Sequence, residues 1–167
     1  RVETLKSHFI PGNRGIAHTR WSTHGAPSDK NAHPFLSQHN DFAIVHNGII
    51  ENYLELKEQL RQEGISFTSE TDSEVIVHLL AKQYTGDLKE AVLKTIPHLQ
   101  GAYAFCVIHK DNNEIIGARN GSPLVVGLGT HENFLASDVS AIIEHTKKVI
   151  YLNDFELARI TPEEVEV

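Results

Sequence analysis

The spacing of the apolar residues changes near residue 100 of this chain, after three consecutive helical segments. Before that point apolar side chains recur at helical spacing in three segments, at 50–63, from Thr71 or Asp72 onward, and at 88–96. Gly64 directly follows the first segment and is typical of a helix end. This part of the chain therefore predicts three helices in succession.

After residue 100 the pattern becomes that of strands. The segment from Ala102 to Ile108 is apolar on both alternating faces, which is typical of a strand covered on two sides. Two earlier strands are predicted over 15–21 and 42–46, with a long polar loop over 22–40 between them. This order of elements predicts an α+β fold of stacked sheets with helices outside. Further strands are expected over 114–119, 124–128, 134–137, 149–152 and 155–161.

The composition excludes several classes of protein. The 167 residues suit one domain, and 15 basic against 22 acidic residues give a net charge of -7, the wrong sign for a nucleic-acid partner. No segment approaches the ~20 apolar residues of a membrane span. The single cysteine, Cys106, cannot form an internal disulfide and suits the cytoplasm. The chain starts at Arg1 and contains no methionine, so we expect a fragment or a processed product.

Polar and ionisable side chains are concentrated between His18 and Gly25. This segment holds the guanidinium of Arg20, the only tryptophan, three hydroxyls and two imidazoles. The planar fork of an arginine can bind a carboxylate through two parallel hydrogen bonds, and the other groups could then orient the ligand. A hydrogen-bonded polar loop without a ligand explains this segment equally well.

The pair Asn47-Gly48 also has two explanations. It is typical of a tight hairpin turn, because both residues tolerate positive φ, yet the residues from Ile49 to Leu60 have helical rather than strand periodicity. Alternatively, an asparagine amide beside a glycine N–H can form an oxyanion hole, which stabilises the tetrahedral intermediate of acyl transfer. The pair by itself leaves both explanations open.

Asp72 stands at a predicted helix start, where a carboxylate commonly caps unpaired N–H groups. In the alternative, its side chain faces inward and accepts a hydrogen bond from an ammonium group of a ligand. Arg20 and Asp72 together would then bind the two ends of an α-amino acid. Neither residue alone supports that hypothesis.

Four motifs, in this order, resemble the glutaminase domains of the glutamine:fructose-6-phosphate aminotransferase family. They are His18 to Gly25, Asn31 to Pro34, His46 to Asn52 and Ser69 to Glu74, and two later segments, Gly121 to Leu124 and Ala136 to Asp138, match as well. The resemblance implies the four-layer α-β-β-α sandwich of the N-terminal-nucleophile hydrolases, with its first strands missing. It also implies that residues 1–167 are a partial glutamine amidotransferase domain, without the isomerase domains.

The resemblance assigns five residues to the substrate. It implies that Arg20 binds the α-carboxylate of glutamine and that Asp72 receives the α-ammonium group. Thr23 and His24 would lie near the carboxylate, and Trp21 would lie where ammonia leaves the pocket. Trp21 and His24 also favour this family over the related amidophosphoribosyltransferases.

Asn47 and Gly48 match the oxyanion-hole pair of the family, and His33 and His46 match histidines that brace the loop and the strand. The family nucleophile is a cysteine at the mature N-terminus, whose own α-amino group handles the proton. That opening motif is absent from this chain, so the chain alone is expected to be inactive. Cys106 does not replace it, because it lies in a segment predicted to be buried on both faces.

The resemblance implies the reaction and partners of the whole enzyme. Glutamine would be hydrolysed to glutamate, and the ammonia would pass to fructose 6-phosphate to make glucosamine 6-phosphate. We expect a cytoplasmic homodimer with no cofactor and no metal, and no contact with nucleic acid or membrane. The alternatives are an amidophosphoribosyltransferase-type domain and a catalytically dead module that binds glutamine.

Overall fold

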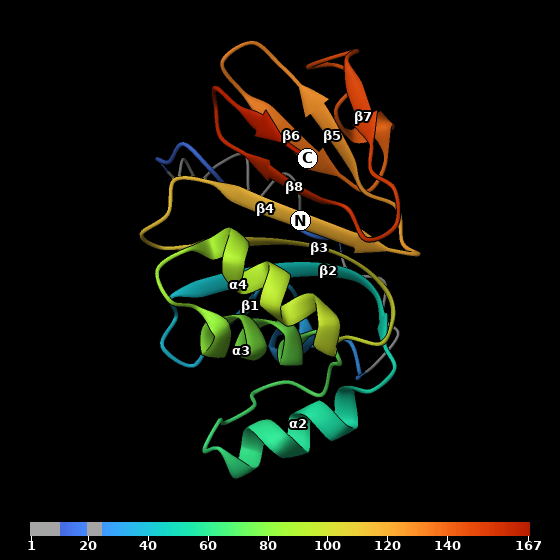
Figure 1. The fold of residues 1–167 in the computed structure, drawn as a ribbon. Helices are drawn as coiled ribbons and strands as arrows, with labels where there is room; N and C mark the ends of the chain where they lie inside the picture. The colour runs from blue at the N-terminus through green and yellow to red at the C-terminus, as the bar shows by residue number, and fades with distance from the viewer. Residues whose placement is uncertain (1–10, 20–24) are drawn as a thin grey trace.

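The computed structural model describes residues 11–19 and 25–167, and their elements form two stacked sheets with helices on one side (Figure 1). The strands pair in the orders β1-β2-β3-β4-β8-β9 and β6-β5-β7, with antiparallel neighbours throughout. The larger sheet contains β1 (Phe35–Leu36), β2 (Phe42–Ile50), β3 (Gly101–His109), β4 (Ile115–Asn120), β8 (Leu157–Ile160) and β9 (Val165–Glu166). The smaller sheet contains β5 (Val125–Leu128), β6 (Asn133–Ala136) and β7 (Val149–Tyr151).

The helices lie on one side of the larger sheet. Figure 1 shows α3 (Glu74–Gln83) and α4 (Leu88–Thr95) against this face, with α2 (Tyr53–Gln62) further out beside α3. The helices bury apolar side chains against large residues of the central strands, among them Tyr103, Phe105 and Ile44. These contacts form the main hydrophobic core of the domain.

The smaller sheet packs on the opposite face of the larger one. Here the contacting side chains of the larger sheet include the small residues Ala104 and Cys106 beside Val45. A Cβ added at Gly117 of β4 would come within 2.9 Å of Leu124 and Leu135, so a glycine allows the sheets to approach closely at this point. Each central strand therefore contributes alternate residues to two different interfaces.

The structure confirms the predicted α+β class. All three helices form close to the expected residues, and α4 is capped by Asp87, whose side chain accepts a hydrogen bond from Glu90 N at 2.9 Å. The described elements supply a helical layer and two sheets of the predicted sandwich. None of the helices in the described part of the chain has the length and apolar character needed to cross a bilayer.

Two strand predictions were wrong in detail, and two short strands were not predicted. Residues 15–19 form no strand, because no described segment pairs with them, and residues 20–21 lie outside the described residues. The strand expected over 42–46 continues to Ile50, since Gly48 keeps its pairing with Tyr103 at a φ of +121°. The two-residue strands β1 and β9 were not predicted, because two residues are too few to show an alternating pattern.

Candidate functional site

Asn47 lies on the face of β2 that points toward the smaller sheet, beside a cavity of about 440 Å³. Strand alternation places its neighbours His46 and Gly48 on the other face. The lining includes residues of the N-terminal segment and of both sheets: Ala17, His18, Thr19, Val45, His46, Asn47, Ala104, Cys106, Leu124, Leu135, Ala136, Ser137 and Ala141. The asparagine amide is therefore presented to a space that can hold a small ligand.

Only a glycine fits at position 48. Its φ of +121° is outside the range that side chains favour, and an added Cβ would come within 2.1 Å of the Ala102 carbonyl oxygen. The same Cβ would lie 3.0 Å from the hydroxyl of Ser122. The hairpin explanation for Asn47-Gly48 is wrong, because both residues lie within β2; the glycine allows a close approach of two backbones.

His18 connects the N-terminal segment to Asn47. Its Nε2 and Asn47 Oδ1 form a hydrogen bond of 2.7 Å. The His18 ring lies against the His33 ring, with 4.1 Å between the centroids, and the His33 ring meets Phe35 edge-on at 4.7 Å. Contacts among these three rings thus fix the position of the segment that comes immediately before Arg20.

Asp72 is connected to β2 through its side chain. It is only 2% exposed, and its Oδ2 accepts a hydrogen bond from Ile50 N at 2.8 Å. Helix α3 begins after Ser73, which makes no side-chain cap. The carboxylate of Asp72 is therefore held at the end of β2, two residues beyond Gly48.

Glu74 was missed by the sequence reasoning, although it fixes the loop that carries Asp72. Its two carboxylate oxygens accept four hydrogen bonds of 2.6 to 2.9 Å from the backbone N–H and hydroxyl groups of Thr68 and Ser69. Burial alone would raise the pKa of this carboxyl, but the His78 ring, whose Nε2 lies 3.6 Å away, and the hydrogen bonds from Thr68 and Ser69 outweigh it and lower the pKa to about 2. The Thr-x-x-Glu spacing from Thr71 to Glu74 is a capping-box pattern that could have drawn attention to it.

Two further side chains hold the same loop. Lys57 of α2 donates a hydrogen bond to the Ser69 carbonyl at 2.9 Å, and burial lowers the pKa of its ammonium group. Asn31, which is fully buried, accepts from Glu70 N at 2.9 Å and donates to the Ala26 carbonyl at 3.0 Å. The loop before Asp72 is thereby linked to the helical layer and to the segment that begins at Gly25.

His46 braces the strand on its buried face, in agreement with the role implied by the resemblance. Its Nδ1 is hydrogen-bonded to the hydroxyl of Ser73 at 2.8 Å. Burial lowers the pKa of His46 to about 4, against the opposing effect of nearby Asp72, so the ring is neutral at pH 7. The hydrogen bond joins β2 to the start of α3.

The other predicted substrate residues, Arg20, Trp21, Thr23 and His24, lie outside the described residues. The flanking residues are described. On one side Thr19 lines the cavity beside Asn47, and on the other Gly25 packs so closely on Asn31 that an added Cβ would lie 2.6 Å from its amide nitrogen.

Cys106 is not an activated nucleophile in this structure. It is buried in β3, and burial raises the pKa of its thiol to about 12. Within residues 11–19 and 25–167, no group of three or more His, Cys, Asp or Glu side chains could hold a metal ion. The described site therefore offers hydrogen-bond donors and a buried carboxylate.

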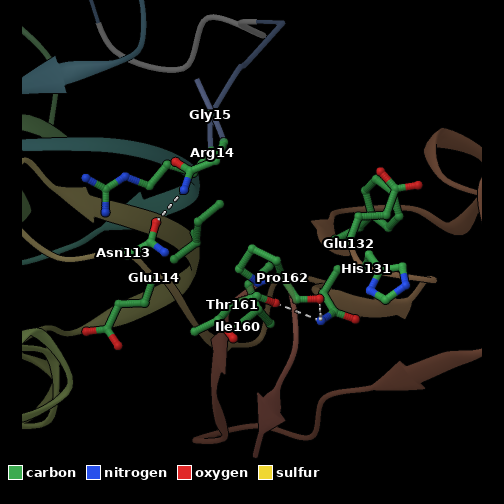
Figure 2. A pocket seen from close by; sticks show the side chains of 13 residues that line it. Arg14, Gly15, Asn113, Glu114, His131, Glu132, Ile160, Thr161 and Pro162 are labelled. Carbon is green, nitrogen blue, oxygen red and sulfur yellow. Dashed lines mark hydrogen bonds between the residues drawn. The ribbon is translucent and has the colours of Figure 1, made fainter. Parts of the chain in front are cut away.

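A separate cavity of about 250 Å³ contains none of the predicted site residues (Figure 2). It lies between the N-terminal segment around Arg14 and the turns that carry His131 and Pro162. Several of its polar groups bond one another, as Asn13 does with the Asn113 side chain at 2.8 Å. We therefore place the functional site at the end of β2.

Comparisons with known proteins show the family of this chain. The profile of the glutamine amidotransferase domain matches residues 18–144, which is most of the chain. The chain belongs to this family. The matched range includes His18, Asn47, Gly48 and Asp72, which are the described residues of the candidate site.

Two curated relatives of this glutamine amidotransferase domain are longer proteins that share one name. Glutamine–fructose-6-phosphate aminotransferase (isomerizing) of Aquifex aeolicus is 61% identical over 167 residues, covering 99% of this chain and 28% of that protein. The enzyme of the same name from Fusobacterium nucleatum is 48% identical and covers 100% of this chain and 28% of that protein. The chain thus spans a little over a quarter of the length of these relatives.

Solved structures share the fold of this amidotransferase domain at lower identity. Glutamine phosphoribosylpyrophosphate amidotransferase from B. subtilis, in complex with ADP and GMP, matches with a TM-score of 0.72 and 31% identity over 89% of this chain and 33% of that one. A structure described as the allosteric regulatory enzyme of purine biosynthesis matches with a TM-score of 0.71 and 30% identity. These likenesses confirm the predicted relation to the N-terminal-nucleophile amidotransferases.

Proposed function

We propose that this chain is the glutamine-hydrolysing part of a glutamine:fructose-6-phosphate aminotransferase. The observation that carries the proposal is the placement of Asn47, Gly48 and Asp72 at one end of β2, where Asn47 lines a cavity of about 440 Å³. The identity of 61% to the Aquifex enzyme over 99% of the chain supports the choice of family branch.

The proposed substrate is L-glutamine, bound at both ends of its α-amino acid group. Asp72 accepts hydrogen bonds from the α-ammonium group, while the guanidinium of Arg20 pairs with the α-carboxylate. Thr23 and His24 contribute near the carboxylate, and Trp21 lies at the side from which ammonia leaves. Two charged groups of opposite sign would thus select an α-amino acid over a simple amide.

The proposed reaction proceeds through a thioester. An N-terminal cysteine thiolate attacks the side-chain amide carbon of glutamine, and the carbonyl oxygen becomes an oxyanion. Asn47 Nδ2 and Gly48 N–H donate hydrogen bonds to that oxyanion, which lowers the barrier to its formation. Collapse of the intermediate breaks the C–N bond while the α-amino group of the cysteine passes the thiol proton to the leaving nitrogen, which departs as ammonia. Water then hydrolyses the thioester to glutamate and frees the thiol.

The nucleophile and the acceptor site belong, in this proposal, to the longer protein that contains residues 1–167. This range would be a partial glutamine amidotransferase domain, and isomerase domains would bind fructose 6-phosphate and receive the ammonia. The activity for which the relatives are named supports this acceptor. We further propose that the whole enzyme is a cytoplasmic homodimer, whose subunit number can be measured by sedimentation.

A glutaminase assay tests the proposal. The full-length protein with its N-terminal cysteine should release glutamate from glutamine, whereas the chain of 167 residues should not. In the full-length protein Arg20→Ala should raise KM for glutamine far more than the matched control Cys106→Ser. Equal activity of the short and long proteins, or equal effects of the two variants, would contradict the proposal.

The choice of acceptor has its own test. An amidophosphoribosyltransferase shares the fold, but the solved example is 31% identical, against 61% for the Aquifex aminotransferase. Ammonia transfer to fructose 6-phosphate is therefore expected, and transfer only to phosphoribosyl pyrophosphate would favour the other branch. A protein that binds glutamine but has no N-terminal cysteine would instead be a binding module.

A further inference from the structure

Asn47 can donate to an oxyanion only if its carboxamide group is turned the right way. The oxygen and nitrogen of this group are nearly equal in shape, so a neighbouring hydrogen-bonding group must select one orientation. In the structure Oδ1 faces Nε2 of His18 at 2.7 Å, which turns Nδ2 away from the imidazole ring. We propose that His18 is a positioning residue that holds the Asn47 amide as a donor; this inference rests on the proposed glutaminase function.

The selection depends on which nitrogen of His18 carries the proton. A protonated Nε2 donates to the Asn47 oxygen, whereas an unprotonated Nε2 would attract the amide nitrogen and turn the group around. Nδ1 of His18 is buried and has no hydrogen-bond partner among the described residues. A proton on Nδ1 would therefore be a buried donor without an acceptor in the described part of the chain, so a neutral ring would carry its proton on Nε2.

The packing around His18 keeps the ring in place for this purpose. The ring of His33 lies 4.1 Å from that of His18 at an interplanar angle of 44°, and His33 is supported by Phe35 of β1. Because β1 pairs with β2, the strand that bears Asn47 also carries the ring stack. The donor and its target are thus attached to the same rigid sheet.

A purely structural role is the alternative explanation. Residues 11–19 contain no strand, so the contact from His18 to Asn47 could serve only to hold that segment on the domain. The two explanations differ in what they require at position 18. Orientation of Asn47 requires an N–H donor, whereas attachment of the segment requires mainly the ring and its contact with His33.

The experiment uses two variants of the full-length protein that contains this chain. His18→Phe keeps an aromatic ring for the contact with His33 and removes the donor, while His18→Gln removes the ring and keeps an amide N–H. We expect His18→Phe to lower kcat for glutamine hydrolysis by about 10- to 100-fold with little change in KM, because an oxyanion donor acts in the transition state. His18→Gln should recover most of kcat.

Two kinetic results would overturn the inference. One is an unchanged kcat in His18→Phe. The other is an equal loss of kcat in both variants with a parallel loss of thermal stability, which a structural role predicts. A rise in KM without a fall in kcat would likewise contradict it, because it would place His18 in ground-state binding.

A spectroscopic measurement separates this inference from the proposed function. In the ¹⁵N-histidine-labelled full-length protein, the imidazole nitrogen shifts of His18 should show a protonated Nε2 and an unprotonated Nδ1. A proton on Nδ1 would refute the positioning role even in an active glutaminase. If the wild-type protein hydrolyses no glutamine, the proposed function fails, and the tautomer still decides whether His18 orients Asn47.

Discussion

The two faces of the larger sheet are packed differently. On the face toward the helices, large side chains such as Tyr103 and Phe105 are fully buried in the main core. On the face toward the smaller sheet, β3 presents Ala104 and Cys106, and a cavity of about 440 Å³ adjoins Asn47. The same strands thus provide a dense core on one side and room for a ligand on the other.

Contacts on the face toward the helices also fix the position of site residues at the end of β2. Asp72 reaches β2 from the loop before α3, and that loop is fixed by the buried carboxylate of Glu74. His46 connects the same strand to Ser73. A precise arrangement beside the cavity therefore depends on hydrogen bonds made behind the sheet, where water is excluded.

Gly48→Ala should have the largest effect on stability and activity, since the added Cβ meets the backbone of β3 beside Asn47. The new Cβ would come within 2.1 Å of the Ala102 carbonyl oxygen at a φ of +121°, so we expect a loss of about 4 kcal/mol in unfolding free energy. Glutaminase activity should also be lost in the full-length protein. Gly64→Ala is the matched control: φ is +88° but no atom lies within 4 Å of the added Cβ, so the loss should be about 1 kcal/mol. Similar losses in both variants would refute the role of the close approach.

Glu74→Gln should have the next largest effect on the free energy of unfolding, and it tests the contacts on the face toward the helices. The folded pKa of about 2 lies below the usual 4.5, so the ionised carboxylate stabilises the fold by about 3 kcal/mol at neutral pH. This contribution is fully present above pH 4.5 and is lost as the pH falls from 4.5 toward 2. Denaturant unfolding over that range should show a flatter pH dependence for the variant than for the wild type. Glu70→Gln is the control: Lys30 also lowers the pKa of this carboxyl, but solvent screens the exposed pair, so the slope should change much less than in Glu74→Gln.

Asp72→Asn should act mainly on substrate binding. The remaining side-chain oxygen can still accept from Ile50 N, while the negative charge proposed to bind the α-ammonium group is removed. We expect KM for glutamine to rise by about 10- to 100-fold with a smaller change in kcat. Steady-state kinetics of the full-length protein measures both constants. An unchanged KM would show that Asp72 serves only to hold the end of β2.

Cys106→Ala should have the smallest effect on stability and activity, and it tests the face toward the smaller sheet. The side chain removed is small, so we expect a loss of about 1 kcal/mol in unfolding free energy and nearly unchanged glutaminase activity. Because burial raises the thiol pKa to about 12, an alkylating reagent at pH 7 should label Cys106 only after denaturation. Mass spectrometry of native and unfolded samples measures this difference. Rapid labelling of the native protein would show that the cavity exposes the thiol.

The fold could be predicted largely because its signals are local. The helix that ends before Gly64 and the two-sided strand around Phe105 follow from the spacing of apolar residues within each segment. The strand expected over 15–21 failed at its described residues because a strand needs a partner, and pairing is not encoded in the segment itself. For the same reason the sequence did not show that β2 runs through Asn47 and Gly48.

The sequence by itself determined the residue types of the candidate site and, through four ordered motifs, the family. It determined these because chemical identity and spacing along the chain are properties of the sequence. The tertiary structure decided that Gly48 faces the Ala102 carbonyl, that Asp72 bonds Ile50, and that Glu74 holds the intervening loop. These contacts join residues distant in the chain, and only packing of the helices and sheets brings them within hydrogen-bond range.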